Sequence, residues 1–169
     1  MNVSSAKSAR ALSKRIVVNG TKQGLTVSGA ESCTGGLIAK YLTDIPGSSA
    51  VFCGACVTYT NKIKQNLLGV DPAIIDRHTE VSYACAEAMA EGARRAFDTE
   101  IAYSTTGYAG PGGGTEADPV GTVYLAISTK EETVSYRLSL PKNATRNHIR
   151  QEAARTVLEH IDTILSQKG

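Results

Sequence analysis

The sequence contains no tryptophan, and aromatic residues make up only 5% of its 169 positions. It has no marked excess of either charge, with 18 Lys+Arg against 16 Asp+Glu and a formal net charge of +2. A protein held to nucleic acid mainly by charge usually shows a basic stripe and a much higher pI, so we expect no nucleic-acid partner. The hydrophobic content of 41% also excludes an intrinsically disordered chain.

Long hydrophobic runs are missing as well. No stretch reaches the roughly 18 consecutive apolar residues of a membrane span. The first twenty residues carry charges at Lys7, Arg10, Lys14 and Arg15, so they lack the apolar centre of a signal peptide. We therefore expect a cytoplasmic protein with no membrane partner. Its length favours a single domain over residues 1–169.

Cysteine is scarce, and only Cys53 and Cys56 have the C-x-x-C spacing that zinc sites and redox motifs share. They lie in the run AVFCGACVTYT, which predicts a strand buried on both faces. Residues three apart on a strand point to opposite faces, so the two sulfurs cannot converge on one ion or one disulfide. We expect plain buried thiols, no metal site and no cofactor.

Apolar periodicity and turn residues predict helices and strands that alternate along the chain. The predicted helices cover residues 5–22, a segment opening at Thr34, residues 61–68, a segment after Asp71-Pro72, and residues 82–96 and 144–166. The predicted strands cover residues 25–30, 50–59, 100–106, 120–129 and 132–140. This order indicates an α/β fold with helices on both faces of a mixed, mainly parallel sheet.

Glycines and hydroxyl groups gather where strands are predicted to end, and ligands of open α/β sheets bind beyond the carboxyl ends of the strands. The first such segment is Ala30-Glu-Ser-Cys-Thr-Gly-Gly36, at a strand-to-helix junction. Free backbone N–H groups at the start of a helix suit an oxyanion or a phosphate. It lacks the lysine-containing signature of a Walker A loop. A tight turn whose glycines serve only packing is the alternative.

Two further segments meet the same description. Pro46-Gly-Ser-Ser49 is followed by Tyr59-Thr-Asn-Lys-Ile-Lys64, and a lysine in a helical turn is usually a solvated charge. Lys64 becomes a catalytic candidate only if apolar surroundings lower its pKa and a serine hydroxyl lies within reach. The segment Thr106–Thr115 holds five glycines within nine residues. Ordering so many glycines on folding costs conformational entropy. Close approach of the backbone to a ligand therefore explains them better than a flexible linker does.

Arg146 and Arg150 are spaced four residues apart near the start of the last predicted helix, and so lie on one face. Both could bind a phosphate through bidentate hydrogen bonds. Two ordinary surface arginines are the alternative. The three histidines are scattered, which gives no support to a Ser-His-Asp triad.

Together these segments strongly resemble the CinA C-terminal domain family. The resemblance runs from about Leu12 to Leu165. It rests on the motifs Ala30-Glu-Ser-Cys-Thr-Gly-Gly-Leu, Pro46-Gly-Ser-Ser-Ala-Val-Phe, Val57-Thr-Tyr-Thr-Asn-Lys-Ile-Lys and Thr106-Gly-Tyr-Ala-Gly-Pro-Gly-Gly-Gly-Thr. It implies a three-layer α/β/α sandwich over a mixed five-stranded sheet. It also implies that only the amidase-type part is present, without the extra N-terminal domain of longer members.

Stand-alone members of this family are nicotinamide-nucleotide amidases. The resemblance therefore implies hydrolysis of the carboxamide of nicotinamide mononucleotide (NMN) to nicotinate mononucleotide and ammonia, a step of pyridine-nucleotide recycling. It implies a Ser/Lys system without a metal or organic cofactor, with Ser32, Ser49, Lys64 and Tyr59 as the catalytic positions. Either serine is eligible as the nucleophile. The expected substrate-binding residues are Glu31, Thr34, Gly35, Gly36, Thr106, Gly107, Gly110, Gly112, Gly113, Arg146 and Arg150.

The sequence departs from the family pattern at two points. Tyr108 replaces a usual aliphatic residue in the glycine loop, which would alter the shape of the pocket. The segment Asn143-Ala-Thr-Arg146 lacks the commoner Gly-Asp before its arginine, which weakens the assignment of Arg146. Two other functions stay open: a nucleotide-binding regulatory module without turnover, and a serine amidohydrolase for another small amide. The expected partner is a small-molecule nucleotide, and a homo-oligomer is compatible with the sequence.

Overall fold

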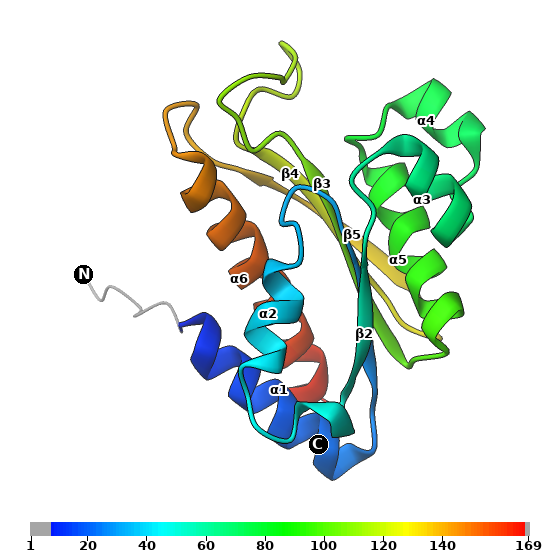
Figure 1. Ribbon diagram of the computed structural model, residues 1–169, viewed down its shortest axis with the longest axis vertical. Coiled ribbons are helices and arrows are strands. Elements are labelled where there is room, and N and C mark those ends of the chain that lie inside the picture. The colour runs from blue at the N-terminus through cyan, green and yellow to red at the C-terminus, as the bar shows by residue number, and fades with distance from the viewer. Residues whose placement is uncertain (1–7, 168–169) are drawn as a thin grey trace.

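A five-stranded β-sheet runs through the molecule in the strand order β2-β1-β3-β4-β5 (Figure 1). The computed structural model describes residues 8–167. The strands are β1 Val27–Glu31, β2 Phe52–Val57, β3 Ile101–Gly107, β4 Thr122–Ser128 and β5 Thr133–Ser139. β1 is parallel to β2 and β3, whereas β4 is antiparallel to both β3 and β5. Four strands therefore share one direction and β4 opposes them, which agrees with the mixed, mainly parallel sheet expected.

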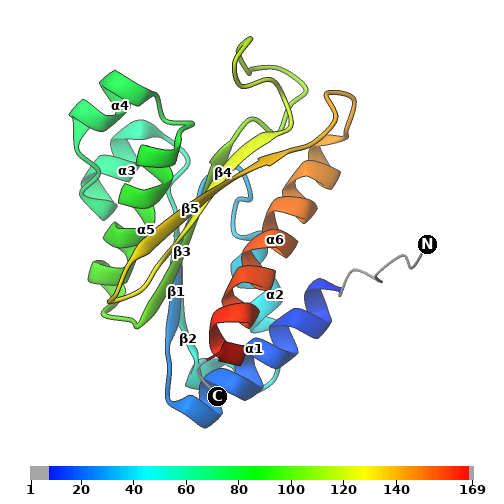
Figure 2. The same ribbon diagram turned by 180° about the vertical axis from the view of Figure 1, so that it is seen from behind.

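Helices cover both faces of this sheet, so the α/β sandwich of three layers is confirmed (Figures 1 and 2). One face carries α1 Ala9–Gln23, α2 Leu37–Thr43 and α6 Arg146–Gln167, and the other carries α3 Asn61–Leu68, α4 Pro72–His78 and α5 Tyr83–Phe97. Residues 5–7 of the first predicted helix lie outside the described residues. Within the part of the chain that is described, no helix is long and apolar enough to cross a membrane.

The two faces of the sheet are packed differently. Large aliphatic side chains of α1, α2 and α6, such as Ile16, Leu42 and Leu158, fill the first face and are fully buried. The opposite face is packed closely, because α5 presents small residues to the sheet and to α3. A Cβ atom on Gly92 of α5 would lie 2.2 Å from the carbonyl oxygen of Leu68, so glycine permits this close approach.

Strand β2 lies at the edge of the sheet, and the prediction that it is buried on both faces is wrong. Its residues are half-buried or exposed, because β1 covers only one of its edges. The register with β1 shifts after Phe52, so that Cys53 has no partner residue across the ladder. All four cysteines are free; Cys53 is exposed and Cys56 is half-buried, so the expectation of buried thiols fails for this pair.

The carboxyl ends of β1, β2 and β3 meet at one end of the sheet, because these strands are parallel neighbours. The loops that follow them are therefore brought together: residues 32–36 after β1, residues 58–60 after β2 and residues 108–121 after β3. This end of the sheet lies at the top of Figure 1. It is the place where an open α/β sheet binds ligands.

Candidate active site

A cavity of about 390 Å³ opens beyond the carboxyl ends of these three strands. Its walls come from the loop after β1, the start of α3, the connection between α4 and α5, the loop after β3 and the start of α6. The lining residues are Ser32, Cys33, Tyr59, Thr60, Asn61, Lys64, Glu80, Val81, Thr106, Gly107, Tyr108, Ala109 and Arg146. A second cavity, of about 430 Å³, lies between β5 and α6 and is lined by no serine, cysteine, lysine or arginine.

Ser32 and Lys64 are in direct contact inside the first cavity. Lys64 Nζ lies 3.2 Å from Ser32 Oγ and donates to the carbonyl oxygen of Thr58 at 2.8 Å. Ser32 is the first residue after β1, and its backbone N–H donates to the carbonyl oxygen of Thr105 on β3. Lys64 extends from the first turn of α3 and is only 1% exposed. The alternative that this lysine is a solvated surface charge is therefore excluded.

Burial lowers the pKa of Lys64, and the negative charges of Cys85, when its thiol is ionised, and of the Glu80 carboxylate act in the opposite direction. A lowered pKa increases the fraction of neutral amine at a given pH. A neutral amine can keep one N–H on the carbonyl oxygen of Thr58 and turn its lone pair toward the hydroxyl of Ser32. The geometry is therefore that of a hydroxyl nucleophile beside a general base.

Cys33 is the other potential nucleophile that lines the cavity. Burial raises its pKa to about 12, so the thiol stays protonated near neutral pH. The thiolate is the reactive form of cysteine, and Cys33 is therefore the weaker candidate. Within residues 8–167, no group of three or more His, Cys, Asp and Glu side chains is placed to hold a metal ion.

Ser49 lies at the other end of the sheet. It is an exposed residue in the short 3₁₀ helix η1 Ser48–Ala50, which precedes β2. Phe52, the first residue of β2, pairs with Val27 at the start of β1, whereas Ser32 follows the end of β1. Of the two serines expected from the sequence, only Ser32 is within hydrogen-bond distance of Lys64.

Arg146 connects three walls of the cavity. Its Nη1 donates to the carbonyl oxygen of Gly110 at 2.7 Å, and its Nη2 donates to the hydroxyl of Tyr59 at 3.0 Å. Each guanidinium has five N–H donors, so further donors are available for an anion. Tyr59, which was expected to be catalytic, is 58% exposed and holds the arginine.

Glu31 does not line the cavity, although the sequence suggested a substrate-binding role. Its carboxylate is fully buried and accepts hydrogen bonds from the backbone N–H groups of Gly36, Ile38 and Ala39 and from the hydroxyls of Thr34 and Tyr103. The first amides of α2 are therefore occupied by a side chain of the protein. This corrects the expectation that they are free for an oxyanion or a phosphate.

The loop between β1 and α2 is braced from outside as well. Arg150 Nη2 donates to the carbonyl oxygen of Thr34 at 2.7 Å, so this arginine supports the loop and does not line the cavity. Gly35 and Gly36, at φ values of 59° and 90°, make the turn possible and also lie outside the lining. Of the glycine loop after β3, Gly107 lines the cavity, but Gly110, Gly112 and Gly113 do not.

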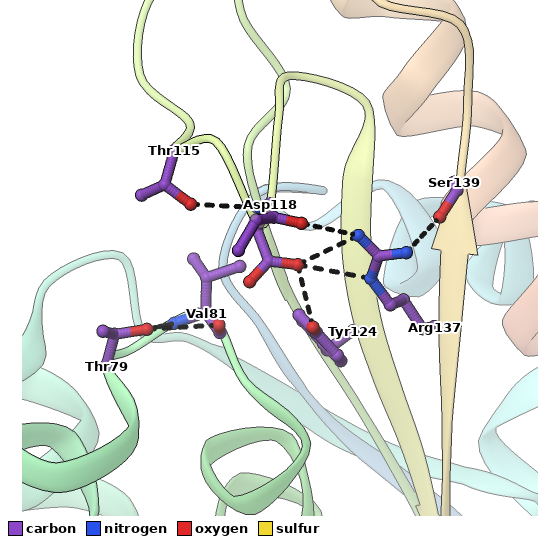
Figure 3. A network of polar contacts seen from close by, with 8 residues as sticks. Thr79, Val81, Thr115, Asp118, Tyr124, Arg137 and Ser139 are labelled. Carbon is purple, nitrogen blue, oxygen red and sulfur yellow. Dashed lines mark hydrogen bonds and ion pairs between the residues drawn. The ribbon is translucent and has the colours of Figure 1, made fainter.

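Glu80 and Val81 line the cavity without having been expected from the sequence, and Tyr108 was expected only as a departure from the family pattern. Glu80 and Val81 lie in the connection between α4 and α5, which carries no recognisable motif. Thr79 Oγ1 accepts from the N–H of Val81 at 3.3 Å and donates to its carbonyl oxygen at 3.2 Å, which fixes this turn (Figure 3). The hydroxyl of Thr106 donates to the carbonyl oxygen of Glu80 at 2.6 Å.

Polar contacts also hold the glycine loop that faces this turn. Asp118 Oδ1 accepts from the hydroxyl of Tyr124 at 2.9 Å and from Arg137 Nη2 at 3.1 Å, as Figure 3 shows. The N–H of Asp118 donates to the hydroxyl of Thr115 at 2.9 Å. These contacts tie the loop to β4 and β5 and so fix the wall that carries Tyr108.

Comparisons with known proteins agree with this architecture. The family model described as the CinA C-terminal domain matches residues 9–165. A solved structure of the competence/damage inducible protein CihA from Agrobacterium tumefaciens matches with a TM-score of 0.89 and 41% identity, over 94% of this chain and 95% of that chain. A CinA superfamily protein from Klebsiella pneumoniae matches with a TM-score of 0.89 and 27% identity, over 95% of this chain and 99% of that chain.

Two curated relatives are similar in sequence over part of their length. A "CinA-like protein" of Myxococcus xanthus is 52% identical over 139 residues, which are 82% of this chain and 32% of the relative. A "nicotinamide-nucleotide amidohydrolase PncC" of Shewanella oneidensis is 49% identical over 121 residues, which are 72% of this chain and 28% of the relative. The matched region therefore spans about a third of the length of these relatives.

Proposed function

The chain belongs to the CinA C-terminal domain family, and we propose that it hydrolyses the carboxamide of NMN to nicotinate mononucleotide and ammonia. The contact between the buried Lys64 and Ser32, 3.2 Å apart inside the cavity, is the observation that carries this proposal. The relative named as a nicotinamide-nucleotide amidohydrolase supports the choice of substrate. Pyridine-nucleotide recycling is the process in which such a reaction takes part.

Formation of a covalent intermediate is the first half of the proposed reaction. Neutral Lys64 takes the proton of the Ser32 hydroxyl as Ser32 Oγ bonds to the carboxamide carbon. The protonated amine then passes that proton to the amide nitrogen, the C–N bond breaks, and ammonia leaves. Ser32 remains joined to the nicotinate part as an ester. The side chains of Thr60 and Asn61, which line the cavity, are donors for the negative charge on the carbonyl oxygen.

Hydrolysis of the ester is the second half. Water loses a proton to Lys64 and attacks the ester carbon, and the bond to Ser32 Oγ breaks. Lys64 returns the proton to Ser32, which restores both groups. Arg146 holds the phosphate of the substrate through N–H donors that Gly110 and Tyr59 leave unused.

Release of ammonia from NMN by the purified chain is the direct test. We expect wild-type protein to release ammonia, and Ser32→Ala and Lys64→Met each to lose about 10²–10⁴-fold in kcat. The double variant should be little worse than either single variant, because the two groups act as one unit. Ser49→Ala should retain activity, since Ser49 lies at the opposite end of the sheet.

Each other outcome of this assay has a defined meaning. Binding of NMN without ammonia release would replace the proposal with a regulatory nucleotide-binding module. Release of ammonia from another small amide, but not from NMN, would keep the Ser/Lys chemistry and reject the substrate. Loss of activity in Ser49→Ala with full activity in Ser32→Ala would overturn the assignment of the nucleophile.

A further inference from the structure

One acidic side chain in the cavity has no part in the proposed proton transfers. Glu80 is half-buried and lines the same cavity as Ser32 and Lys64. Its backbone is held by the hydroxyl of Thr106, 2.6 Å from the Glu80 carbonyl oxygen. Among residues 8–167, its carboxylate has no hydrogen-bond or ion-pair partner. A carboxylate that lines a ligand cavity attracts a cationic ligand, because opposite charges interact favourably.

Tyr108 is an aromatic residue that lines the same cavity as Glu80. Both residues line one cavity, and the negative charge of Glu80 contributes, after burial, to the raised pKa of Tyr108. Glu80 comes from the connection between α4 and α5, and Tyr108 comes from the loop after β3. A carboxylate beside an aromatic ring forms a favourable environment for an organic cation, because the face of the ring is negative.

The charges of the cavity match those of the proposed substrate. The ring nitrogen of NMN is quaternised and gives the pyridinium a positive charge, and the phosphate is negative. Arg146 supplies a cation for the phosphate, and Glu80 supplies an anion for the ring. A cavity of about 390 Å³ lies within the usual range of small-molecule sites.

We infer that Glu80, together with Tyr108 in the same cavity, selects N-quaternised pyridine carboxamides over neutral aromatic carboxamides of the same shape. This inference rests on the proposed function, because it concerns the same site and the same reaction. Glu80 acts on the ring of the substrate, and it exchanges no proton with the reacting carboxamide.

A neutral analogue of NMN separates ring charge from shape. Benzamide mononucleotide carries the same carboxamide, ribose and phosphate on an uncharged ring. We expect Glu80→Gln to lower kcat/KM for NMN by about tenfold, because the variant loses the attraction between the carboxylate and the pyridinium ring. In the same variant, kcat/KM for benzamide mononucleotide should change by less than about twofold from its wild-type value. Taking the ratio of the two substrates cancels any effect of Glu80 on the base, Lys64, because that effect is common to both.

Two variants complete the experiment. Glu80→Asp keeps the charge and should retain most of the preference for NMN. Glu91→Gln removes a carboxylate on α5 that pairs with Arg95 outside the cavity, and should leave both substrates unchanged. Circular dichroism of each variant confirms that it is folded.

The inference and the proposed function fail in different ways. Wild-type protein that releases no ammonia from NMN rejects the proposed function, whatever Glu80 does. Wild-type protein that hydrolyses NMN, together with a Glu80→Gln variant whose ratio between the two substrates is unchanged, overturns the inference alone. An equal loss of kcat/KM for both substrates also overturns the inference, because it would show that Glu80 positions other groups and does not select for the charge of the ring.

Discussion

The surroundings of Lys64 suit the role of general base that we propose for it. Burial lowers its pKa from the ordinary value of 10.5, while the negative charges of Cys85, when its thiol is ionised, and of Glu80 oppose this shift. The base must be neutral to accept a proton, so activity should increase as pH rises through the lowered pKa of Lys64. Below this pKa Lys64 is protonated and cannot act as a base, so activity should be lost as the pH falls.

The pH dependence of kcat/KM for NMN tests this assignment. Charged groups near Lys64 are Glu80 and, when ionised, Cys85 and Cys33. Removing the negative charge in Glu80→Gln should lower the pKa of Lys64 further and move the rising limb to lower pH. Cys85→Ser serves as a control, because its thiol is protonated in this range: burial raises its pKa to about 11. A limb that stays in place in Glu80→Gln would show that another group is the base.

Arg146 gives a second prediction for a single residue. Arg146→Ala removes the proposed phosphate donor together with its bonds to Gly110 and Tyr59. We expect KM for NMN to rise, with a loss of about 1.5–3 kcal/mol in transition-state stabilisation if a charged hydrogen bond is lost. Nicotinamide riboside, which lacks the phosphate, should be a poor substrate of the wild type and should be affected little by the change. Equal turnover of NMN and the riboside by wild type would contradict the assignment.

At the scale of secondary-structure elements, the junction between β1 and α2 depends on Glu31. Its buried carboxylate gathers three backbone N–H groups and two hydroxyls, and Tyr103 reaches it because Gly29 leaves room for the tyrosine ring. A Cβ atom on Gly29 would lie 2.1 Å from the Cζ atom of Tyr103. The loop that begins with Ser32 is therefore shaped by groups outside the cavity.

Substitution of Glu31 should consequently disturb both stability and activity. In Glu31→Gln, the NH2 group of the new amide replaces a carboxylate oxygen that accepts hydrogen bonds, so some of the five donors lose their acceptor. We expect the free energy of unfolding to fall by about 2–4 kcal/mol. Urea denaturation measures this loss, and kcat for NMN measures the displacement of Ser32. Glu91→Gln, an exposed carboxylate on α5, is the matched control and should stay within about 0.5 kcal/mol of wild type. An unchanged urea midpoint for Glu31→Gln would show that the carboxylate does not hold the loop.

The elements themselves could be predicted from the sequence, because their signals are local. The Asp71 cap before Pro72 is found as expected, with Asp71 Oδ1 accepting from the N–H of Ala73. The burial of β2 was mispredicted, because an apolar run does not show whether a strand lies at the centre or at the edge of a sheet. Only the strand order, which depends on pairing between distant segments, decides this.

Residues of the candidate site that belong to a sequence motif could be predicted, whereas those outside a motif could not. Ser32 and Lys64 belong to motifs, and the structure brings them together. The position of Ser49 at the other end of the sheet could not be read from its own motif, since it depends on the register of β2 with β1. Glu80 lies in a connection without any motif and enters the cavity only because α4 and α5 pack beside α3.

For the molecule as a whole, the rates at which the four thiols react report how readily different parts of the native structure open. Cys53 is exposed on the edge strand, whereas Cys33 and Cys85 are buried on opposite sides of the sheet, in separate core clusters. In the native protein, a thiol reagent should modify Cys53 first and Cys56 more slowly. Cys33 and Cys85 should react only at the rate of opening of the structure, because burial also raises their pKa to about 12 and about 11.

Counting modified thiols by mass spectrometry over time tests this expectation. Cys53→Ser should remove the fast phase and leave the slow phases unchanged. Rapid modification of Cys33 in the native protein would show that the cavity opens far more readily than the burial of this residue implies.

The place of Tyr108 on the wall of the cavity has an optical consequence. Because the chain holds no tryptophan, Tyr108→Trp would introduce a single indole fluorophore at the site where the substrate ring is proposed to lie. A pyridinium cation next to an indole accepts an electron from the excited state, so its arrival should quench the emission. Binding of the substrate could then be followed in real time as a decrease in tryptophan fluorescence, without a label.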